Sequence, residues 1–408
     1  MVNVRPVTVP TAETRWPLPR LRRVLLGLYV AAALADAGGK AIAASPAAND
    51  AIARFLHGGA ADRLRDAKRP SGNFEIFRGA SRHLFAGADM YAEYPAEQQD
   101  RFKYSPAFAL LFAPLAYLPW PLALFLWSTL NAVVLFTAIE RVLPQREALV
   151  ALSFLLLEVI RAMQNAQSNA LVAGLVVLAW VALERANAWR AAAAVALGAC
   201  VKIFPLAALT FAIPRRLAIR CGLWAAAFGA LLLALPLAIT RPASLAAQYR
   251  SWRAVESVDA GQRWFSVMEL LHRWTGAGWP NWPVQAAGTL ALLAPLALHR
   301  ERWDDRRFRF LYLCSVLMYL VLFNHQAERA SYVIAFAGIA LWFAAEPRAA
   351  WRTALFGAAF VTMPVLSTLV PVPALRSPTM MLYRLALPTL LVWLAVQREL
   401  WARARVAA

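Results

Sequence analysis

The chain has 408 residues, of which 61% are hydrophobic and only 16% are charged, and its formal net charge is +19. Repeated apolar runs of about 20 residues, the length that crosses a bilayer, exclude an ordinary soluble protein and predict an all-α polytopic membrane protein. The positive charge does not indicate a nucleic-acid partner, because most basic residues stand in short connectors between apolar runs, as topology signals do. The three cysteines, Cys200, Cys221 and Cys314, have no paired spacing and predict neither a disulfide framework nor a zinc site.

The apolar runs begin after a polar, proline-containing tail at residues 1–20. We predict a retained first span at 24–44, because the run lacks a clean small-residue cleavage site before Asp36 and Lys40. A polar loop at 45–105 and a short apolar segment at 106–118 follow. Nine further spans are predicted at 120–140, 147–163, 167–184, 222–240, 284–298, 310–324, 329–345, 353–370 and 379–396.

The distribution of Lys and Arg predicts the orientation in the membrane. The two tails and five short connectors hold 22 of these residues, whereas the short connectors on the opposite side hold only Arg376. Connectors rich in Lys and Arg stay in the cytoplasm. We therefore predict a multi-pass protein of the cytoplasmic membrane with both termini in the cytoplasm. A first outer loop at 45–119 and a second outer loop at 241–283 then face outward.

One apolar run does not fit a simple alternation of spans. The run at 191–213 has basic residues on both flanks, Arg190 before it and Arg215 after it. Lys202 and Pro205, a charge and a helix breaker, stand in its middle. We predict a re-entrant pair of half-helices here, since irregular backbone at membrane depth is tolerated where protein covers it.

Ionisable residues inside predicted spans are costly, so they are candidates for function. In this topology they fall in the outer half of the membrane, and they include five cations: Lys40, Arg161, Lys202, Arg329 and Arg384. Such a set suits the phosphate of a lipid ligand. The alternative is that each cation is paired, as Arg161 can pair with Glu158 at i,i+3, or that it extends to the outer interface.

The first outer loop carries a pattern of residues that can be compared with known families. The pattern comprises Asn73-Phe74-x-Ile76-Phe77, Leu84-x-x-Gly87-x-x-x-Tyr91, Phe102-Lys103-Tyr104-Ser105-Pro106-x-Phe108-Ala109-Leu110 and Pro114-Leu115-x-x-Leu118-Pro119. Shorter elements follow at Gln167-x-Asn169, Lys202-x-x-Pro205 and Asn324-His325-x-x-Glu328. Over roughly residues 70–345 the chain resembles glycosyltransferase family 87, whose members are C-type integral-membrane glycosyltransferases that use polyprenyl-phosphate sugars.

The resemblance implies both a fold and a reaction. The fold would be a single GT-C-like membrane domain at 21–408, with about ten transmembrane helices, a re-entrant element and a long first outer loop. The reaction would be inverting transfer of a hexose such as mannose from polyprenyl phosphate to a lipid or glycan acceptor, without metal or cofactor. In the family, a carboxylate of the first outer loop is the general base, and cations stabilise the phosphate leaving group.

The chain departs from the family pattern at the general base. Many relatives have Asp where this chain has Asn73, and an amide cannot accept the proton. We favour Asp100 as the replacement, because it precedes the point where the chain re-enters the membrane, and we take Glu75 as the second candidate. The remaining candidates are Asp89, Glu93 and Glu97. The alternative is that these acids only solvate a basic loop.

The buried charges and the resemblance together predict a set of substrate- and phosphate-binding residues. The set is Lys103, Tyr104, Arg161, Gln167, Asn169, Lys202, Asn324, His325, Glu328, Arg329 and Arg384. His325 is a candidate second acid or base within it. Tyr91, Tyr94 and Tyr104 are candidates for stacking on a sugar ring or for anchoring at the membrane interface.

Two other functions share some of these features. A transporter or flippase for lipid-linked sugars would also contain buried charges and a re-entrant element, but the sequence has no repeat in two halves, which transporters often show. A non-catalytic partner in envelope assembly would explain Asn73. We favour the transferase, because residues able to do chemistry are concentrated in the first outer loop.

Overall fold

The computed structural model describes residues 17–45, 72–97, 100–347, 349–370, 375 and 377–402. These residues form sixteen α-helices with short 3₁₀ and π segments and no strand. This confirms the predicted all-α class. Most of the tail predicted at 1–20, residues 46–71 of the predicted first outer loop, and Arg376 lie outside the described residues.

The helices correspond closely to the predicted apolar runs. The α-helices are α1 (Leu18–Ala43), α4 (Gly72–Ala86), α5 (Pro106–Ala116), α6 (Trp120–Glu140), α7 (Gln145–Gln164), α8 (Asn169–Glu184), α9 (Ala188–Val201), α10 (Ala218–Ala234), α11 (Pro242–Asp259), α12 (Val267–Thr275), α13 (Asn281–Leu298), α14 (Arg306–Leu322), α15 (Tyr332–Ala345), α16 (Ala350–Phe360), α17 (Leu366–Thr368) and α18 (Pro378–Trp401). The 3₁₀ segments are η1 (Phe204–Ala212), η2 (Leu235–Ala238), η3 (Arg300–Arg302) and η4 (Arg329–Ser331), and η5 (Val361–Val365) is a π segment.

Within the described residues, four elements are long and apolar enough to cross a membrane by length and composition: α1, α6, α10 with its continuation η2, and α18. The prediction of ten complete spans is therefore not confirmed. α7 is long, but it carries several charges, including Glu158 and Arg161. The run predicted at 353–370 is divided into α16, η5 and α17 around Pro364. α8, and α15 together with η4, are shorter apolar helices.

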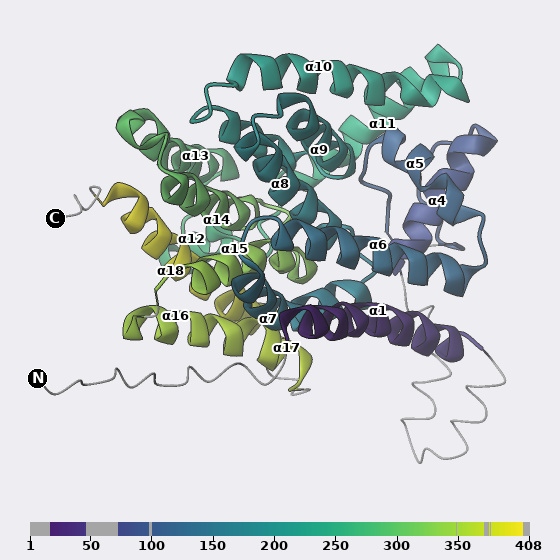
Figure 1. Ribbon diagram of the computed structural model, residues 1–408. Helices are drawn as coiled ribbons and strands as arrows, with labels where there is room; N and C mark the ends of the chain where they lie inside the picture. The colour runs from purple at the N-terminus through teal and green to yellow at the C-terminus, as the bar shows by residue number, and fades with distance from the viewer. Residues whose placement is uncertain are drawn as a thin grey trace, which may run out of the picture.

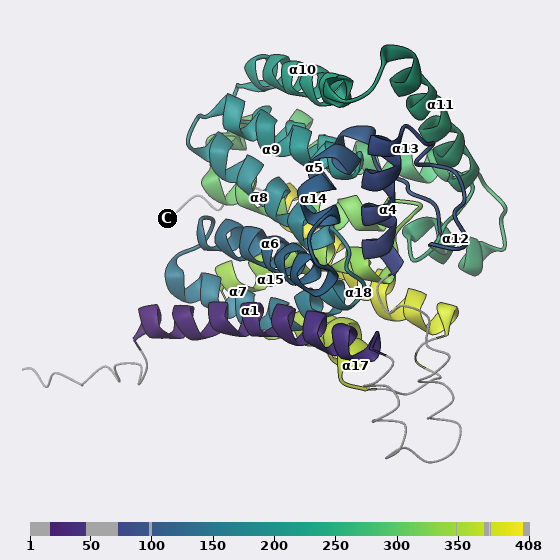
Figure 2. The same cartoon turned by 90° about the vertical axis from the view of Figure 1, so that its right-hand side faces the viewer.

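The helices pack in two groups (Figures 1 and 2). In the first group, α10, α9, α8, α6 and α1 lie one above another in this order, and consecutive members are in contact. The second group contains α13, α14, α15, α16 and α18, with α14 packed against both α15 and α18. α7 joins the groups, since it packs against both α1 and α15.

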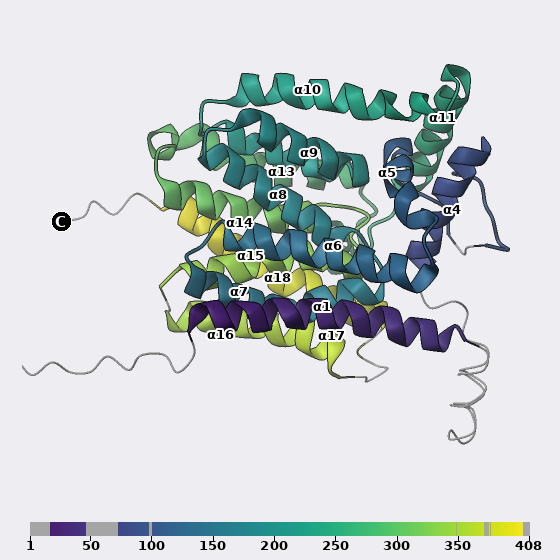
Figure 3. The ribbon, with the colours of Figure 1, turned by 45° about the vertical axis from the view of Figure 1, so that its right-hand side comes forward.

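The segments that link the packed helices, including α4, α5 and α11, lie at two opposite ends of the bundle. α4, α5 and α11 lie at one end, which we call the cavity end (Figure 3). At the other, the basic end, ion pairs and hydrogen bonds join the arginine-rich connectors: Arg22 with Glu140, Arg216 with Asp304, Arg309 with Glu184, and Arg306 with the Val142 carbonyl. The connectors that the charge distribution assigns to one side of the membrane therefore lie together.

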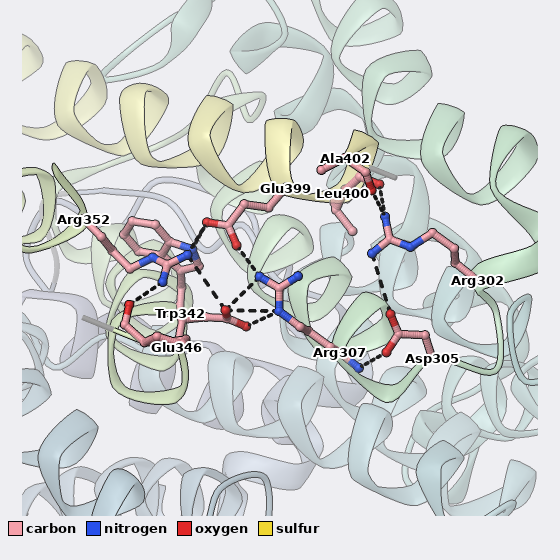
Figure 4. Close-up of polar contacts among 10 residues, drawn as sticks. Arg302, Asp305, Arg307, Trp342, Glu346, Arg352, Glu399, Leu400 and Ala402 are labelled. Carbon is pink, nitrogen blue, oxygen red and sulfur yellow. Dashed lines mark hydrogen bonds and ion pairs between the residues drawn. The ribbon is translucent and has the colours of Figure 1, made fainter. Parts of the chain in front are cut away.

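A charged cluster holds the second group together at the basic end (Figure 4). Arg307 of α14 lies 2.8 Å from Glu346 and 2.7 Å from Glu399, measured from guanidinium nitrogen to carboxylate oxygen. Arg352 of α16 lies 2.7 Å from the same Glu399, and the Trp342 indole of α15 donates to it at 3.2 Å. Glu399 of α18 is thus the acceptor that α14, α15 and α16 share, which fixes their relative positions.

The run predicted to be broken is broken at the predicted residues. α9 ends at Val201, Lys202 is extended with φ −144° and ψ 133°, and the 3₁₀ segment η1 begins at Phe204. At the far end of the segment, the Arg215 guanidinium donates to the Leu183 carbonyl at 3.1 Å. Because Leu183 closely precedes α9, the two ends of the segment lie together and the chain turns back at Lys202.

Two glycines allow helices to approach closely. A Cβ atom on Gly338 of α15 would lie 2.7 Å from the Cys314 carbonyl oxygen of α14, and one on Gly174 of α8 would lie 2.9 Å from the Leu135 amide nitrogen of α6. Both neighbours are backbone atoms, which cannot move aside alone. Small residues at such contacts are typical of helix packing in membranes.

We predict that Gly338→Ala separates α14 from α15 and destabilises the protein by about 1–3 kcal/mol, the usual cost of an overpacked contact. The measurement is the thermal unfolding midpoint in detergent. Gly229→Ala on α10 is the matched control, since no atom lies within 4 Å of the added Cβ, and it should leave the midpoint unchanged or raise it. Equal midpoints for both variants would contradict this account of the α14–α15 contact.

Candidate active site

The described residues line a partly open cavity of about 530 Å³ at the cavity end. Its wall is formed by the start of α4, residues 100–104 before α5, the ends of the helices near Gln167 and Lys202, α11, and the connector 323–328. The lining carries four carboxylates, Asp100, Glu256, Asp259 and Glu328, and three cations, Arg101, Lys103 and Lys202. It therefore combines groups that bind anions with groups that accept protons.

The structure brings many of the predicted site residues to this cavity. Those in the lining are Asn73, Asp100, Lys103, Tyr104, Gln167, Lys202, Asn324, His325 and Glu328. Those outside the lining are Glu75, Arg161, Asn169, Arg329 and Arg384. Of the three candidate stacking tyrosines, Tyr104 is in the lining, whereas Tyr91 donates from its hydroxyl to the Tyr104 carbonyl at 2.6 Å and Tyr94 stacks on His83.

Asn73 takes part in closing the C-terminal end of α7. The last carbonyl groups of a helix lack partners within it. Here the Lys40 ammonium donates to the carbonyls of residues 163 and 164 at 3.1 and 2.9 Å, and the Asn73 amide donates to that of Asn165 at 3.0 Å. The Trp127 indole donates to the Ala166 carbonyl at 2.9 Å. The bond from Asn73 requires an N–H donor, which a carboxylate at this position would lack.

A chain of hydrogen bonds crosses one wall of the cavity. The Tyr104 hydroxyl donates to Gln167 Oε1 at 3.2 Å, and Gln167 Nε2 donates to Glu328 Oε2 at 3.0 Å. Lys202 Nζ lies 5.7 Å from the centre of the Tyr104 ring, within cation–π range. Lys202 stands where α9 ends and points to the same wall, so the break in the helix places an ammonium group beside the cavity.

Three arginines of the predicted set contact protein groups. Arg329 forms two hydrogen bonds of 2.8 Å with Glu158 of α7, and both side chains are buried. Arg384 donates to the Leu375 carbonyl at 2.7 Å and to Ser367 Oγ at 3.0 Å. Arg161 donates to Gln164 Oε1 at 2.8 Å. Among the five cations placed in the outer half of the membrane by sequence, Lys202 is therefore the one in the lining.

The two other predicted residues outside the lining also have defined surroundings. Glu75 accepts a hydrogen bond from the Trp120 indole at the start of α6, so its carboxylate is occupied by a structural contact. Asn169 is fully buried at the start of α8, and neither polar atom of its side chain has a hydrogen-bond partner in the described part of the chain.

Sequence reasoning missed the carboxylates of α11. Glu256 and Asp259 are spaced i,i+3 on this helix and both line the cavity. Asp259 Oδ2 lies 2.9 Å from Lys103 Nζ, and Asp100 Oδ2 lies 3.5 Å from the same nitrogen. The i,i+3 spacing of these two carboxylates is visible in the sequence of the second outer loop. The contact between Asp259 and Lys103 joins two different loops, however, and only the structure reveals it.

Burial and charge adjust the ionisation of two lining groups. Burial alone would lower the pKa of Lys103, but its hydrogen bond with Asp259 and the charges of Asp100 and Asp259 outweigh it and raise that pKa. Burial lowers the pKa of His325, an effect that Asp259 partly opposes. At neutral pH the cavity therefore contains a charged Lys103 and a neutral His325.

The lining is suited to anion binding and proton transfer. The described residues contain no group of three or more His, Cys, Asp or Glu side chains arranged to hold a metal ion. Lys202 and Lys103 can bind a phosphate, and a lining carboxylate can accept a proton from a hydroxyl. Together these groups can perform group transfer from a phosphate-linked donor to a hydroxyl.

Comparison with known families agrees with this chemistry. The model of glycosyltransferase family 87 matches residues 102–323, which is more than half of the chain. The match begins after Asn73 and Asp100 and ends before the Asn324–Glu328 segment, so it covers Lys103 and Lys202 but not the whole cavity wall. No curated protein matches the chain.

We predict that Glu158→Gln destabilises the protein by about 3–5 kcal/mol, because it leaves the Arg329 guanidinium buried without its counter-charge. The thermal unfolding midpoint in detergent measures the effect. Asp304→Asn is the control, since its pair with Arg216 is exposed and such pairs contribute about 0–1 kcal/mol. A midpoint for Glu158→Gln as high as that of the control would contradict a stabilising role of the buried pair.

Proposed function

Because the chain belongs to glycosyltransferase family 87 and is therefore a glycosyltransferase, we propose that it transfers a mannose-like hexose from a polyprenyl-phosphate donor. The acceptor is an envelope glycolipid or polysaccharide, and the transfer takes place on the outer face of the cytoplasmic membrane. The observation that carries the proposal is that Lys202, Lys103 and four carboxylates line the same cavity. A lipid-phosphate sugar needs cations for its phosphate, and its acceptor needs a base.

The proposed reaction is a single inverting displacement. The acceptor hydroxyl oxygen attacks the anomeric carbon of the sugar from the face opposite the phosphate. The bond between that carbon and the phosphate oxygen breaks, and its electron pair leaves with the lipid phosphate, whose charge Lys202 stabilises. The hydroxyl proton goes to a cavity carboxylate. Of the two bases predicted from sequence, Asp100 lines the cavity and Glu75 does not.

The proposed location rests on the separation of the two ends. The arginine-rich connectors meet at the basic end, which by the positive-inside rule is cytoplasmic. The cavity end then faces outward, where a donor can enter from the bilayer. We propose that the shorter apolar helices complete a bundle of about ten crossings, with α9 and η1 as the re-entrant hairpin.

Labelling with a membrane-impermeant thiol reagent in intact cells tests this orientation. A cysteine at Ser257 of α11 should react from outside, whereas one at Asp304, at the basic end, should react only after the cells are permeabilised. Both positions are exposed, and the three native cysteines are buried. Labelling of position 304 in intact cells would overturn the orientation.

The transferase activity is tested with purified protein in liposomes, radiolabelled polyprenyl-phosphate mannose or glucose, and acceptors extracted from membranes. We expect label in the acceptor fraction. Movement of intact donor between leaflets without transfer would support a flippase instead. If the protein neither transfers the sugar nor moves any donor tested, the result would favour a non-catalytic partner in envelope assembly.

In the same assay we predict that Lys202→Ala weakens donor affinity by about 10- to 100-fold, since a hydrogen bond to a charged group contributes about 1.5–3 kcal/mol. The KM for the donor measures the effect. Arg220→Ala, which removes an exposed cation of α10 away from the cavity lining, should leave the KM unchanged. An unchanged KM for Lys202→Ala would remove Lys202 from the phosphate site.

A further inference from the structure

α11 is joined to the first outer loop by several hydrogen bonds. Gln248 accepts from the Met90 amide at 3.2 Å and donates to the Ala88 carbonyl at 2.8 Å. The Trp252 indole, one turn later, donates to the Lys103 carbonyl at 3.2 Å. These bonds hold the last turn of α11, which contains Glu256 and Asp259, against the cavity.

The carboxylates of the cavity have different partners. Asp259 is paired with Lys103 at 2.9 Å and also accepts from Gln262 Nε2 at 2.9 Å. Asp100 shares Lys103, and its side chain is 63% exposed. Glu256 is half-buried and forms no ion pair with any described residue, although Gln326 Nε2 approaches it at 3.5 Å. Glu256 therefore has lone pairs that remain open to a ligand.

The surroundings of Glu256 also make it a stronger base than an exposed carboxylate. Burial raises the pKa of its carboxyl above the usual range. Hydrogen bonding from Trp252 lowers that pKa, and the charge of Asp259 raises it. A general base works best when its pKa approaches the working pH. The two carboxylates of α11 thus differ, since Asp259 is paired with Lys103, whereas Glu256 is able to exchange a proton.

We infer that Glu256 is the general base of the transfer reaction and performs the role that Asn73 cannot. The inference rests on the proposed function. As the acceptor oxygen bonds to the anomeric carbon, its proton moves to a Glu256 oxygen, and the sugar–phosphate bond breaks toward the lipid phosphate. Glu256 then releases the proton to water through the open side of the cavity. Asp259 acts as a positioning residue, since it holds Lys103 beside the reacting groups.

The test compares isosteric variants in the liposome assay. Glu256→Gln keeps the shape of the side chain but cannot accept a proton, so kcat should fall about 10²- to 10⁴-fold. The KM for the polyprenyl-phosphate donor should stay within about twofold of wild type, because donor binding is not changed. Glu256→Asp should retain measurable turnover. Glu301→Gln, at an exposed carboxylate of the basic end, is the control and should match wild type.

The pH profile gives a second readout. The charged groups and the histidine that share the cavity lining with Glu256 are Asp259 on its own helix, Asp100, Arg101 and Lys103 before α5, Lys202 after α9, and His325 and Glu328 on the connector. Because the base must be ionised, the wild-type kcat should rise with pH through the raised pKa of Glu256. The residual activity of Glu256→Gln should lose this rise. If wild type and Glu256→Gln show the same pH dependence of kcat, the group that titrates is not Glu256.

The outcomes separate this inference from the proposed function. Transfer by wild type together with full turnover by Glu256→Gln would overturn the role of Glu256 and leave the transferase intact. Loss of turnover in Asp100→Asn alone would give the base role to Asp100. Absence of transfer by wild type with every donor would overturn the proposed function and the role of Glu256 together.

Discussion

The cavity end depends on one constraint, the need to satisfy the C-terminal carbonyl groups of α7. An unpaired carbonyl is costly in apolar surroundings. The donors that meet this need, Lys40, Asn73 and Trp127, come from α1, α4 and α6. The end of one helix therefore gathers three segments that are far apart in sequence. Arg329, which directly follows the connector 323–328, pairs with Glu158 of α7 and so holds the end of this connector against the same helix.

This constraint gives Asn73 a structural role at the end of α7. The amide at this position donates to a helix end, a contact that a carboxylate would replace with repulsion between two oxygens. In our proposal, a carboxylate on the second outer loop compensates for the base that Asn73 cannot provide. The compensation is possible because Gln248 and Trp252 join the two loops and bring α11 to the cavity wall.

Much of the architecture could be predicted from sequence, because it depends on local rules. α6 occupies the predicted range because Pro119 and Pro121 define its start, and the break after α9 falls at Lys202, as a charge followed by proline predicts. The depth in the membrane predicted from sequence also singled out Lys40, Glu158, Arg329 and Arg384, which are buried in the structure. It could not identify their partners: Arg329 pairs with Glu158 across 171 positions, and no local pattern encodes such a contact. Glu256 was missed for the same reason.

The central claim is that the cavity binds a sugar linked to a lipid phosphate between Lys202 and Glu256. The most direct measurement is a cryo-EM structure of the protein in nanodiscs with a non-hydrolysable phosphonate analogue of polyprenyl-phosphate mannose. We expect phosphonate density beside Lys202, with the sugar extending toward Glu256 and the lipid chain leaving into the bilayer. Phosphonate density at the basic end, for example between Arg185 and Arg220 in the second hollow of about 230 Å³, with an empty central cavity, would contradict it.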